Sequence, residues 1–244
     1  MWDRIFSHLP DWVEPVVDYM LHVGLENTLK IAAVSVMISV SVGVVLGTLL
    51  TVHFRPLEGL IRLYIEVWRG LPIIVTIFLL FFGLPELAES TGIEALRLSE
   101  MRAAILGLGL WGSAQIAEAT RGAVQSIPRE QHEASFALGF GWVGTHVNVI
   151  LPQALRRLLP PLVGLVVNII QNSTLAQILG VPELLETAER STERLSFPLY
   201  DPATGVVEGG DAHAIEIYGF VMVIFFVISF PLTRFAAFLE RRLV

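Results

Sequence analysis

Residues 25–52 decide the fold: they read LENTLKIAAVSVMISVSVGVVLGTLLTV, and their only charged residues, Glu26 and Lys30, lie near the start. A helix that crosses a bilayer needs about 20 mostly apolar residues, and this stretch is long enough. Small residues recur at every fourth position and so share one helical stripe: Ser35, Ser39, Gly43 and Gly47. Such a stripe allows a second helix to approach closely, although small residues are also common in membrane helices without a packing role. We expect a membrane helix that packs through this stripe.

The composition of the whole chain agrees with a membrane protein. Of its 244 residues 54% are apolar and only 16% are charged, whereas about a quarter of a soluble domain is charged. Cysteine is absent and the six histidines have no metal-like spacing, so neither disulfides nor a metal site is expected. The net charge of -7 argues against a nucleic-acid partner. No catalytic residues are assigned.

Four further segments, together with the first, predict the number of spans. They cover residues 57–83, 101–124, 158–180 and 215–238. The inner half of the second holds Arg62, Glu66 and Arg69, which must face protein or the water boundary. Pro231 should kink the last one. The prediction is an all-α polytopic membrane protein with about five transmembrane helices.

The segments outside the spans predict the domain layout. Residues 1–23 lack the basic start and unbroken apolar run of a signal peptide. We expect them to form an interfacial helix with four aromatic residues at headgroup level: Trp2, Phe6, Trp12 and Tyr19. Residues 24–244 then form the transmembrane domain.

Charge placement predicts the orientation in the membrane. Arginines gather after the first span, after the third and in the tail: Arg55, Arg62, Arg121, Arg129, Arg156, Arg157, Arg241 and Arg242. Glutamates and aspartates gather in 84–100 and 181–213. Because cytoplasmic loops are rich in Lys and Arg, we expect the N-terminus outside and the C-terminus in the cytoplasm. Residues 125–157 are then a cytoplasmic loop and 181–213 an external one, irregular from residue 191.

The cytoplasmic loop contains the most informative motif, within residues 128–152, PREQHEASFALGFGWVGTHVNVILP. Small residues after Glu133 favour a short helix, and Gly139 is suited to end it. Such a helix can lie across the membrane surface and fit a groove on a soluble partner, with Glu133 as a charged anchor. The alternative is an ordinary amphipathic surface loop. The spaced residues of the motif are Glu133, Ala134, Ser135, Gly139, Val149, Leu151 and Pro152.

This spacing resembles the EAA loop of bacterial binding-protein-dependent ABC importers, with Ser135 in place of the second Ala and Val149 in place of Ile. The rest of the chain is similar to the polar amino acid permeases of that superfamily. The segments that carry the similarity are residues 24–29, 64–72, 117–128, 151–161, 180–184 and 240–243.

Several positions depart from the pattern of that family. Leu71 stands where Thr is usual, Gln115 near a usual Tyr, and Glu130 where Gly is usual. Residues 171–174, Gln-Asn-Ser-Thr, replace Lys-Asp or Lys-Asn followed by Thr-Ser. This last change removes a positive charge from the presumed path and leaves the identity of the substrate open.

The resemblance implies a type I ABC importer-like fold and a function. The chain would be the permease subunit of an ATP-driven importer for a polar amino acid, coupled to a separate ATPase through Glu133, Ala134, Ser135 and Gly139. It contains no phosphate-binding Gly-x-x-x-x-Gly-Lys-Ser/Thr loop, so it should bind no cofactor, and ATP and Mg should bind to a cytoplasmic ATP-binding dimer. Further expected partners are an external solute-binding protein and a second permease subunit, either a copy or a sister chain, in the bacterial inner membrane.

Polar residues inside the spans are the candidates for the substrate path. Unpaired polar groups are costly in lipid, and amides offer both donors and acceptors to a zwitterion. The alternatives are hydrogen bonds that only hold helices together and, for two of the residues, a structural ion pair between Arg69 and Glu118. The candidates are Arg69, Gln115, Glu118, Asn168, Gln171 and Asn172.

Two other functions deserve comparison with the amino acid importer. One is an ABC importer for a compatible solute or an opine, since these ligands have the same binding needs. The other is a channel or secondary transporter without an ATPase. The coupling motif argues against the second, as does the absence of repeated halves in the chain.

Overall fold

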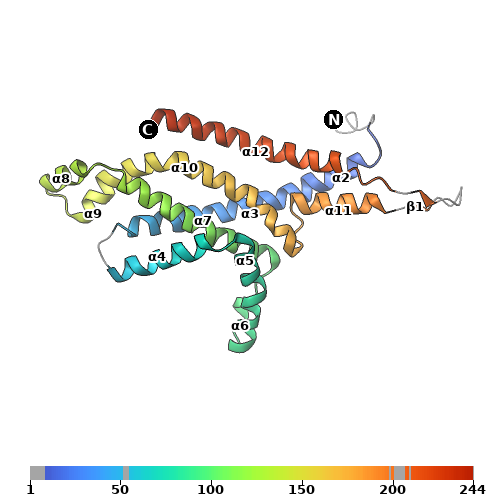
Figure 1. Ribbon diagram of the computed structural model, residues 1–244, viewed down its shortest axis with the longest axis horizontal. Helices are drawn as coiled ribbons and strands as arrows, with labels where there is room; N and C mark the ends of the chain where they lie inside the picture. The colour runs from blue at the N-terminus through green and yellow to red at the C-terminus, as the bar shows by residue number, and fades with distance from the viewer. Residues whose placement is uncertain (1–8, 52–54, 198, 201–206, 209, 244) are drawn as a thin grey trace.

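The computed structural model describes residues 9–51, 55–197, 199–200, 207–208 and 210–243. Long helices run along the longest axis of an elongated molecule, and one helical arm leaves this body at a steep angle (Figure 1). The strands β1 (Leu199–Tyr200) and β2 (Val207–Glu208) form a short antiparallel ladder. The described chain is otherwise built from helices and the turns between them.

The first long helix is continuous from residue 13 to residue 49. It consists of α2 (Val13–Tyr19), the π-helical turn η1 (Met20–Leu25) and α3 (Glu26–Leu49). The described part of the expected interfacial segment 1–23 therefore extends the first span in the same direction. Trp2 and Phe6 lie outside the described residues, and the interfacial role of the segment stays a prediction.

The small-residue stripe of α3 packs against α7 (Glu100–Gln125), as expected. Ser35 and Ser39 are fully buried and donate hydrogen bonds to backbone carbonyls of α7, at 3.2 and 3.3 Å. A Cβ atom at Gly47 would lie 2.3 Å from the carbonyl oxygen of Ala117. The two backbones are thus too close for any larger side chain, which confirms the stripe as a packing face.

The second predicted span is interrupted, so the expectation of one helix over 57–83 is wrong. The helix α4 (Arg55–Gly70) ends before Pro72, whose ψ of 135° is extended. The chain resumes as α5 (Ile73–Phe78), η2 (Leu79–Gly83) and α6 (Leu84–Thr91), followed by the 3₁₀ turn η3 (Glu94–Leu96). A residue before proline disfavours the α conformation, and proline lacks the N–H that would continue the helix.

The segment from α5 to α6 is the arm in Figure 1. Ile77 anchors it to α7, because it is buried and Gly107 leaves room for its side chain. Four large apolar residues on the arm are exposed: Val75, Leu79, Phe82 and Leu87. The arm therefore presents an apolar surface beyond the body of the chain.

The second half of the chain begins with a helical hairpin of α8 (Arg129–Ala137) and α9 (Trp142–Thr145). From α9 the helix continues through η4 (His146–Ile150), α10 (Leu151–Asn172) and η5 (Ser173–Leu179). The helix α11 (Leu184–Ser196) follows, so the expected irregular loop from residue 191 begins later than predicted. The last helix, α12 (Ala214–Leu243), continues through Pro231.

Four helices of the described chain are long and apolar enough to cross a membrane: Val13–Leu49, Ile73–Thr91, Trp142–Leu179 and Ala214–Leu243. The helix α7 is also long, with 26 residues, but its glycines and charged residues make it less apolar. It packs against α3 and also meets α10, since a Cβ at Gly112 would lie 2.9 Å from Ile169. Together these helices confirm the all-α polytopic fold with about five long membrane helices.

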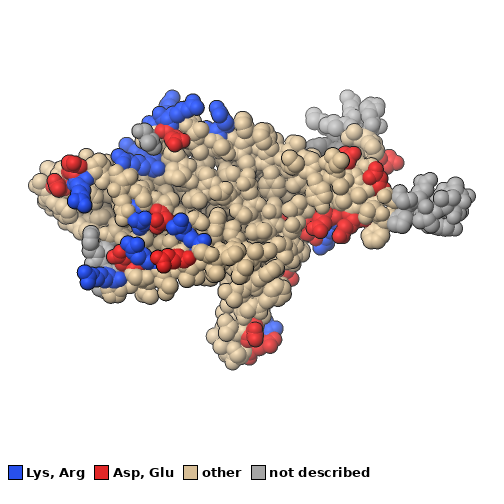
Figure 2. Space-filling view, in the orientation of Figure 1, with Lys and Arg blue, Asp and Glu red and all other residues tan. Residues whose placement is uncertain are grey.

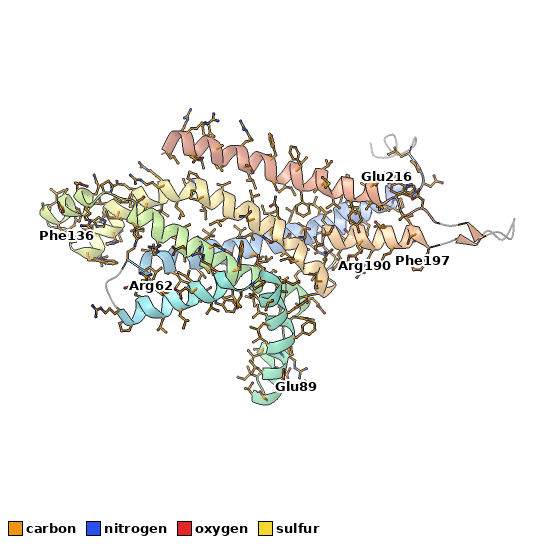
Figure 3. All side chains as sticks on the ribbon, in the orientation of Figure 1. Arg62, Glu89, Phe136, Arg190, Phe197 and Glu216 are labelled. Carbon is orange, nitrogen blue, oxygen red and sulfur yellow. The ribbon has the colours of Figure 1, made fainter. Side chains whose placement is uncertain are left out.

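The charged residues gather at opposite ends of the body (Figure 2). Most Lys and Arg lie toward the end formed by α8, α9 and the end of α12, whereas Asp and Glu surround α11 at the other end. Glu89, by contrast, lies at the tip of the arm (Figure 3), where it is paired with Arg97. An apolar belt separates the two charged ends, as expected for a body that crosses a bilayer.

Candidate functional site

An open surface pocket of about 430 Å³ lies between the end of α4, the middle of α7 and α10, and it is called the polar cavity here because charged and amide side chains contribute to its lining. It brings together four of the six residues that the sequence predicts for the substrate path, which are contributed by three separate helices. Its lining consists of Arg69, Gln115, Glu118, Ala119, Pro161, Gly164, Leu165 and Asn168. A polar cavity of this kind within a membrane protein is a candidate binding site.

The ionic groups of the cavity pair differently from the predicted alternative. Arg121 donates two hydrogen bonds to the Glu118 carboxylate, at 2.9 and 2.5 Å. Arg69 instead donates to the neutral amide of Gln115, at 3.2 Å. Glu118 prefers Arg121 because that residue lies one turn further along the same helix. Arg69 thus makes no ion pair with any described residue, although Glu66 and Glu118 line the same region as its side chain.

A smaller cavity of about 140 Å³ shares Arg69 and Glu118 with the first and extends the polar region toward α4. It adds three charged residues that sequence reasoning did not place on the path: Arg62, Glu66 and Arg121. The spacing of Glu118 and Arg121 by three residues was the signal that would have identified Arg121 as the partner of Glu118.

Gln171 and Asn172 do not line either cavity. The Asn172 amide donates to the backbone carbonyl of Asn168 on its own helix, at 2.8 Å. Gln171 is exposed, and its side chain has no hydrogen bond to a described residue. Within the described chain, therefore, Asn168, Gln171 and Asn172 do not hold two helices together through their side chains.

The predicted coupling residues form a well-defined helix end. The Phe140 N–H donates to the Ser135 carbonyl at 3.1 Å, and the Gly139 N–H to the Phe136 carbonyl at 2.9 Å. Gly139 has a φ of +87°, a left-handed conformation that suits glycine. This is a Schellman cap, which ends α8 at the glycine of the motif. Glu133, Ala134 and Gly139 are exposed, whereas Ser135 is buried.

The hairpin around this cap exposes a series of apolar side chains. Phe136 lies at the opposite end of the molecule from Arg190 and Glu216 (Figure 3). A contiguous exposed apolar patch on a protein is typical of an interaction site. The exposed large apolar residues are Phe136, Leu138, Phe140 and Val143 of the hairpin and Val147 just after it.

At the other end, α3 and the start of α11 meet in a buried polar junction that sequence reasoning missed. Thr28 donates to the Glu183 carboxylate at 3.4 Å and accepts from the Leu184 N–H at 3.0 Å. Asn27 donates to the Pro182 carbonyl at 3.0 Å. Burial raises the pKa of Glu183 to about 7. The junction joins two motif segments, 24–29 and 180–184, that the sequence presents as unrelated.

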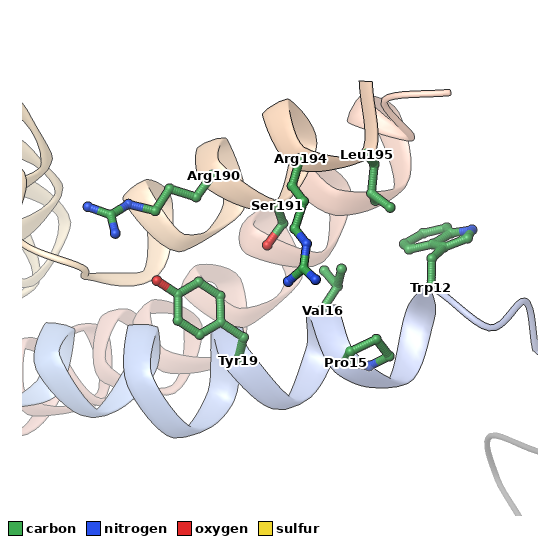
Figure 4. A pocket seen from close by; sticks show the side chains of 8 residues that line it. All are labelled: Trp12, Pro15, Val16, Tyr19, Arg190, Ser191, Arg194 and Leu195. Atoms are coloured by element: carbon green, nitrogen blue, oxygen red, sulfur yellow. The ribbon is translucent and has the colours of Figure 1, made fainter. Parts of the chain in front are cut away.

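A groove of about 360 Å³ lies beside this junction, between α2 and α11 (Figure 4). Trp12 and Tyr19, two of the four aromatic residues expected at headgroup level, line one side of it. Arg190 and Arg194 line the other, and Arg190 is paired with Glu186. No residue of the polar cavity takes part in this groove.

The fold and the hairpin define a class of protein. Residues 39–244 match the family of binding-protein-dependent transport system inner membrane components. The chain therefore belongs to this family and is a membrane permease of the ABC importer type.

Two curated relatives are similar to this chain over most of its length, and both are named as amino acid permeases. The chain is 32% identical over 221 residues to the inner membrane amino-acid ABC transporter permease protein YhdY of Escherichia coli (strain K12), a match that covers 90% of this chain and 55% of the relative. The chain thus spans about half the length of that relative. It is 30% identical over 220 residues to the probable glutamine ABC transporter permease protein GlnM of Bacillus subtilis (strain 168), covering 90% of this chain and 91% of the relative. These relatives confirm the predicted resemblance to polar amino acid ABC permeases.

Solved structures show the same fold. An amino acid ABC transporter crystallised with histidines has a TM-score of 0.76 at 24% identity, over 96% of this chain and 99% of that one. The methionine ABC transporter MetNI, in an inward-facing conformation, has a TM-score of 0.68 at 20% identity, over 93% and 98%. At these identities the similarity concerns the fold alone, and it supports the predicted importer fold.

Proposed function

We propose that this chain is the subunit through which an ATP-driven importer moves a polar amino acid, and that the cavity around Arg69, Gln115, Glu118 and Asn168 lies on the path. The observation that carries this proposal is the convergence of these residues from α4, α7 and α10 on one cavity. Relatives named for amino acid, glutamine, arginine and glutamate/aspartate transport support the substrate class.

The chemistry of the cavity suits a zwitterion. Arg69 makes no ion pair with a described residue, so the two terminal nitrogens of its guanidinium, which do not donate to Gln115, can bind the carboxylate of a ligand in a two-point contact. The Asn168 amide offers a donor and an acceptor, and the Glu118 carboxylate offers acceptors beyond those that Arg121 occupies. A charged ligand is costly to bury unless such partners are present. Glycine at position 164 leaves the cavity open, because a Cβ there would meet no atom within 4 Å.

The proposal also includes the partners that the chain itself lacks. The exposed hairpin of α8 and α9, with Glu133, Ala134, Ser135 and Gly139, docks on a cytoplasmic ATP-binding dimer that binds ATP and Mg. A second permease subunit completes the path, and an external solute-binding protein delivers the substrate. The basic end of Figure 2 then faces the cytoplasm, with the N-terminus outside and the C-terminus inside.

The test is to plug the cavity without disturbing the fold. The variant Gly164→Phe, reconstituted with the ATP-binding subunit and the binding protein, should lose uptake of labelled glutamine and glutamate by at least about tenfold, because the ring fills the cavity. Gly164→Ala should have an intermediate effect. The matched control is Gly219→Phe on α12, where a Cβ also meets no atom within 4 Å. Normal uptake by Gly164→Phe would place the path elsewhere.

The same preparation separates the proposal from its alternatives. Uptake that persists without ATP or without the ATP-binding subunit would favour a channel or secondary transporter. Uptake of a compatible solute or an opine, but of no amino acid, would keep the importer and change its substrate.

A further inference from the structure

The two helices of the hairpin are joined by one buried hydrogen bond between side chains. The hydroxyl oxygens of Ser135 on α8 and Thr145 on α9 are 2.7 Å apart. Both residues are buried, with 2% and 0% of their surface exposed. Buried hydroxyl groups need partners, and here each supplies the other. Ser135 is also the position at which this chain departs from the Glu-Ala-Ala pattern.

Aromatic contacts support the same connection. The ring of His132, one turn before Ser135, meets the edge of His146 at 5.8 Å between centroids. Trp142 stacks on His146 at 3.9 Å. Of these two contacts, the one between His132 and His146 bridges the hairpin, since Trp142 and His146 lie on one continuous helix. It adds a second link to the hydroxyl pair about one helical turn away along α8.

The hydrogen bond between the helices is important because the turn that joins α8 to α9 can adopt several backbone conformations. Its residues 138–141 include Gly139 and Gly141, and glycine restricts the backbone least. From α9, by contrast, the helix continues without a break into α10, which carries Gly164 and Asn168 into the cavity. A displacement of α8 reaches α10 rigidly only if the hairpin does not flex at this turn.

We infer that the Ser135–Thr145 hydrogen bond makes α8 and α10 move as one body, and that Thr145 is a positioning residue for energy coupling. This inference rests on the proposed coupling to an ATPase. The glycine cap ends α8 but does not fix the angle between α8 and α9. In this chain the hydrogen bond between Ser135 and Thr145 fixes that angle.

The experiment measures solute transported per ATP hydrolysed in the complete reconstituted transporter. Ser135→Ala and Thr145→Val should each lower this ratio by about fivefold, the effect of one hydrogen bond. The ATP-binding subunit should still co-purify with Thr145→Val, because Thr145 is not one of the proposed docking residues. The double variant should be no worse than the more affected single variant, because both changes remove the same bond. The exchange Ser135→Thr with Thr145→Ser keeps both hydroxyls and should restore the ratio.

The matched control is Ser35→Ala, which also removes a buried hydroxyl with a partner on another helix. It should leave the ratio unchanged. An unchanged ratio in both single variants, a double variant with multiplied effects, or loss of the ATP-binding subunit from Thr145→Val would each overturn the inference. If the unaltered chain transports without ATP hydrolysis, the proposed function itself fails, and that result is visible before any variant is made.

Discussion

The junction of α3 and α11 at one end of the molecule buries its polar groups, whereas the α8–α9 hairpin at the other end exposes its apolar ones. Thr28 and Glu183 are both fully buried and bonded to each other, while Leu138 of the hairpin is 79% exposed. The hydrogen bond at the junction joins residues that are 155 positions apart in the chain. The hydrogen bonds of the hairpin join residues much closer in the chain, ten residues apart at the Ser135–Thr145 pair and 22 apart at Gln131 and Gln153.

This difference indicates which end stabilises the folded chain and which end is available to bind a partner. A buried, fully bonded junction contributes to the stability of the folded chain, and breaking it leaves polar groups without partners. An exposed apolar patch contributes little to that stability, and it is typical of a surface that binds another protein. Changes at the junction should therefore act on folding, and changes at the hairpin on association. Three predictions test this contrast, in order of their expected effect on stability.

The largest effect is expected for Gly24→Leu at the junction. A Cβ there would lie 2.3 Å from the Thr187 hydroxyl and 3.0 Å from the Leu184 Cα atom. Because backbone and a buried side chain must both shift, the variant should lose about 3 kcal/mol or more of unfolding free energy. Thermal unfolding in detergent measures this loss. Gly219→Leu, at an open position on α12, serves as the control, and equal losses in the two variants would contradict the prediction.

The second effect depends on pH and concerns Glu183. Burial raises its pKa from 4.5 to about 7, so folding favours the protonated carboxyl. The contribution of this group to stability is complete below pH 4.5 and is lost as the pH rises through about 7. The loss amounts to at most roughly 3 kcal/mol.

The variant Glu183→Gln removes this titration. Its unfolding temperature, measured from pH 4.5 to 8, should decline less over that range than the unfolding temperature of the unaltered chain. Glu189→Gln changes an exposed carboxylate on the same helix and should keep the original pH profile. Parallel profiles for Glu183→Gln and the unaltered chain would show that Glu183 does not titrate there.

The smallest effect on stability is expected at the hairpin, for Leu138→Ser. This residue is 79% exposed, so the unfolding free energy should stay within about 0.5 kcal/mol. Co-purification of the ATP-binding subunit should nevertheless fall strongly, since the apolar contact is lost. Leu9→Ser changes an exposed leucine beside the start of α12 and is the control. A large loss of stability in Leu138→Ser, or unchanged co-purification, would show that the hairpin does not differ from the junction in acting on association instead of folding.

Much of the fold could be predicted because the membrane imposes simple rules on a sequence. Apolar length indicated most of the long helices, and the period of Ser35, Ser39, Gly43 and Gly47 indicated the face that packs on α7. The break before Pro72 was missed because the apolar pattern continues across it, although the proline was the local signal. Four candidate residues of the path converge on one cavity because polar groups in a span must face something other than lipid.

By itself the sequence determined the family, the long helices and the position of the hairpin, since each depends on neighbours along the chain: apolar runs, spaced motifs and a glycine that ends a helix. Only the tertiary structure decided which distant groups meet. It placed Arg69 against Gln115 instead of Glu118, and it joined Thr28 to Glu183. The direction of the arm also depended on it. Such pairings depend on how helices cross in space, and helical periodicity along one chain does not specify the register of one helix against another.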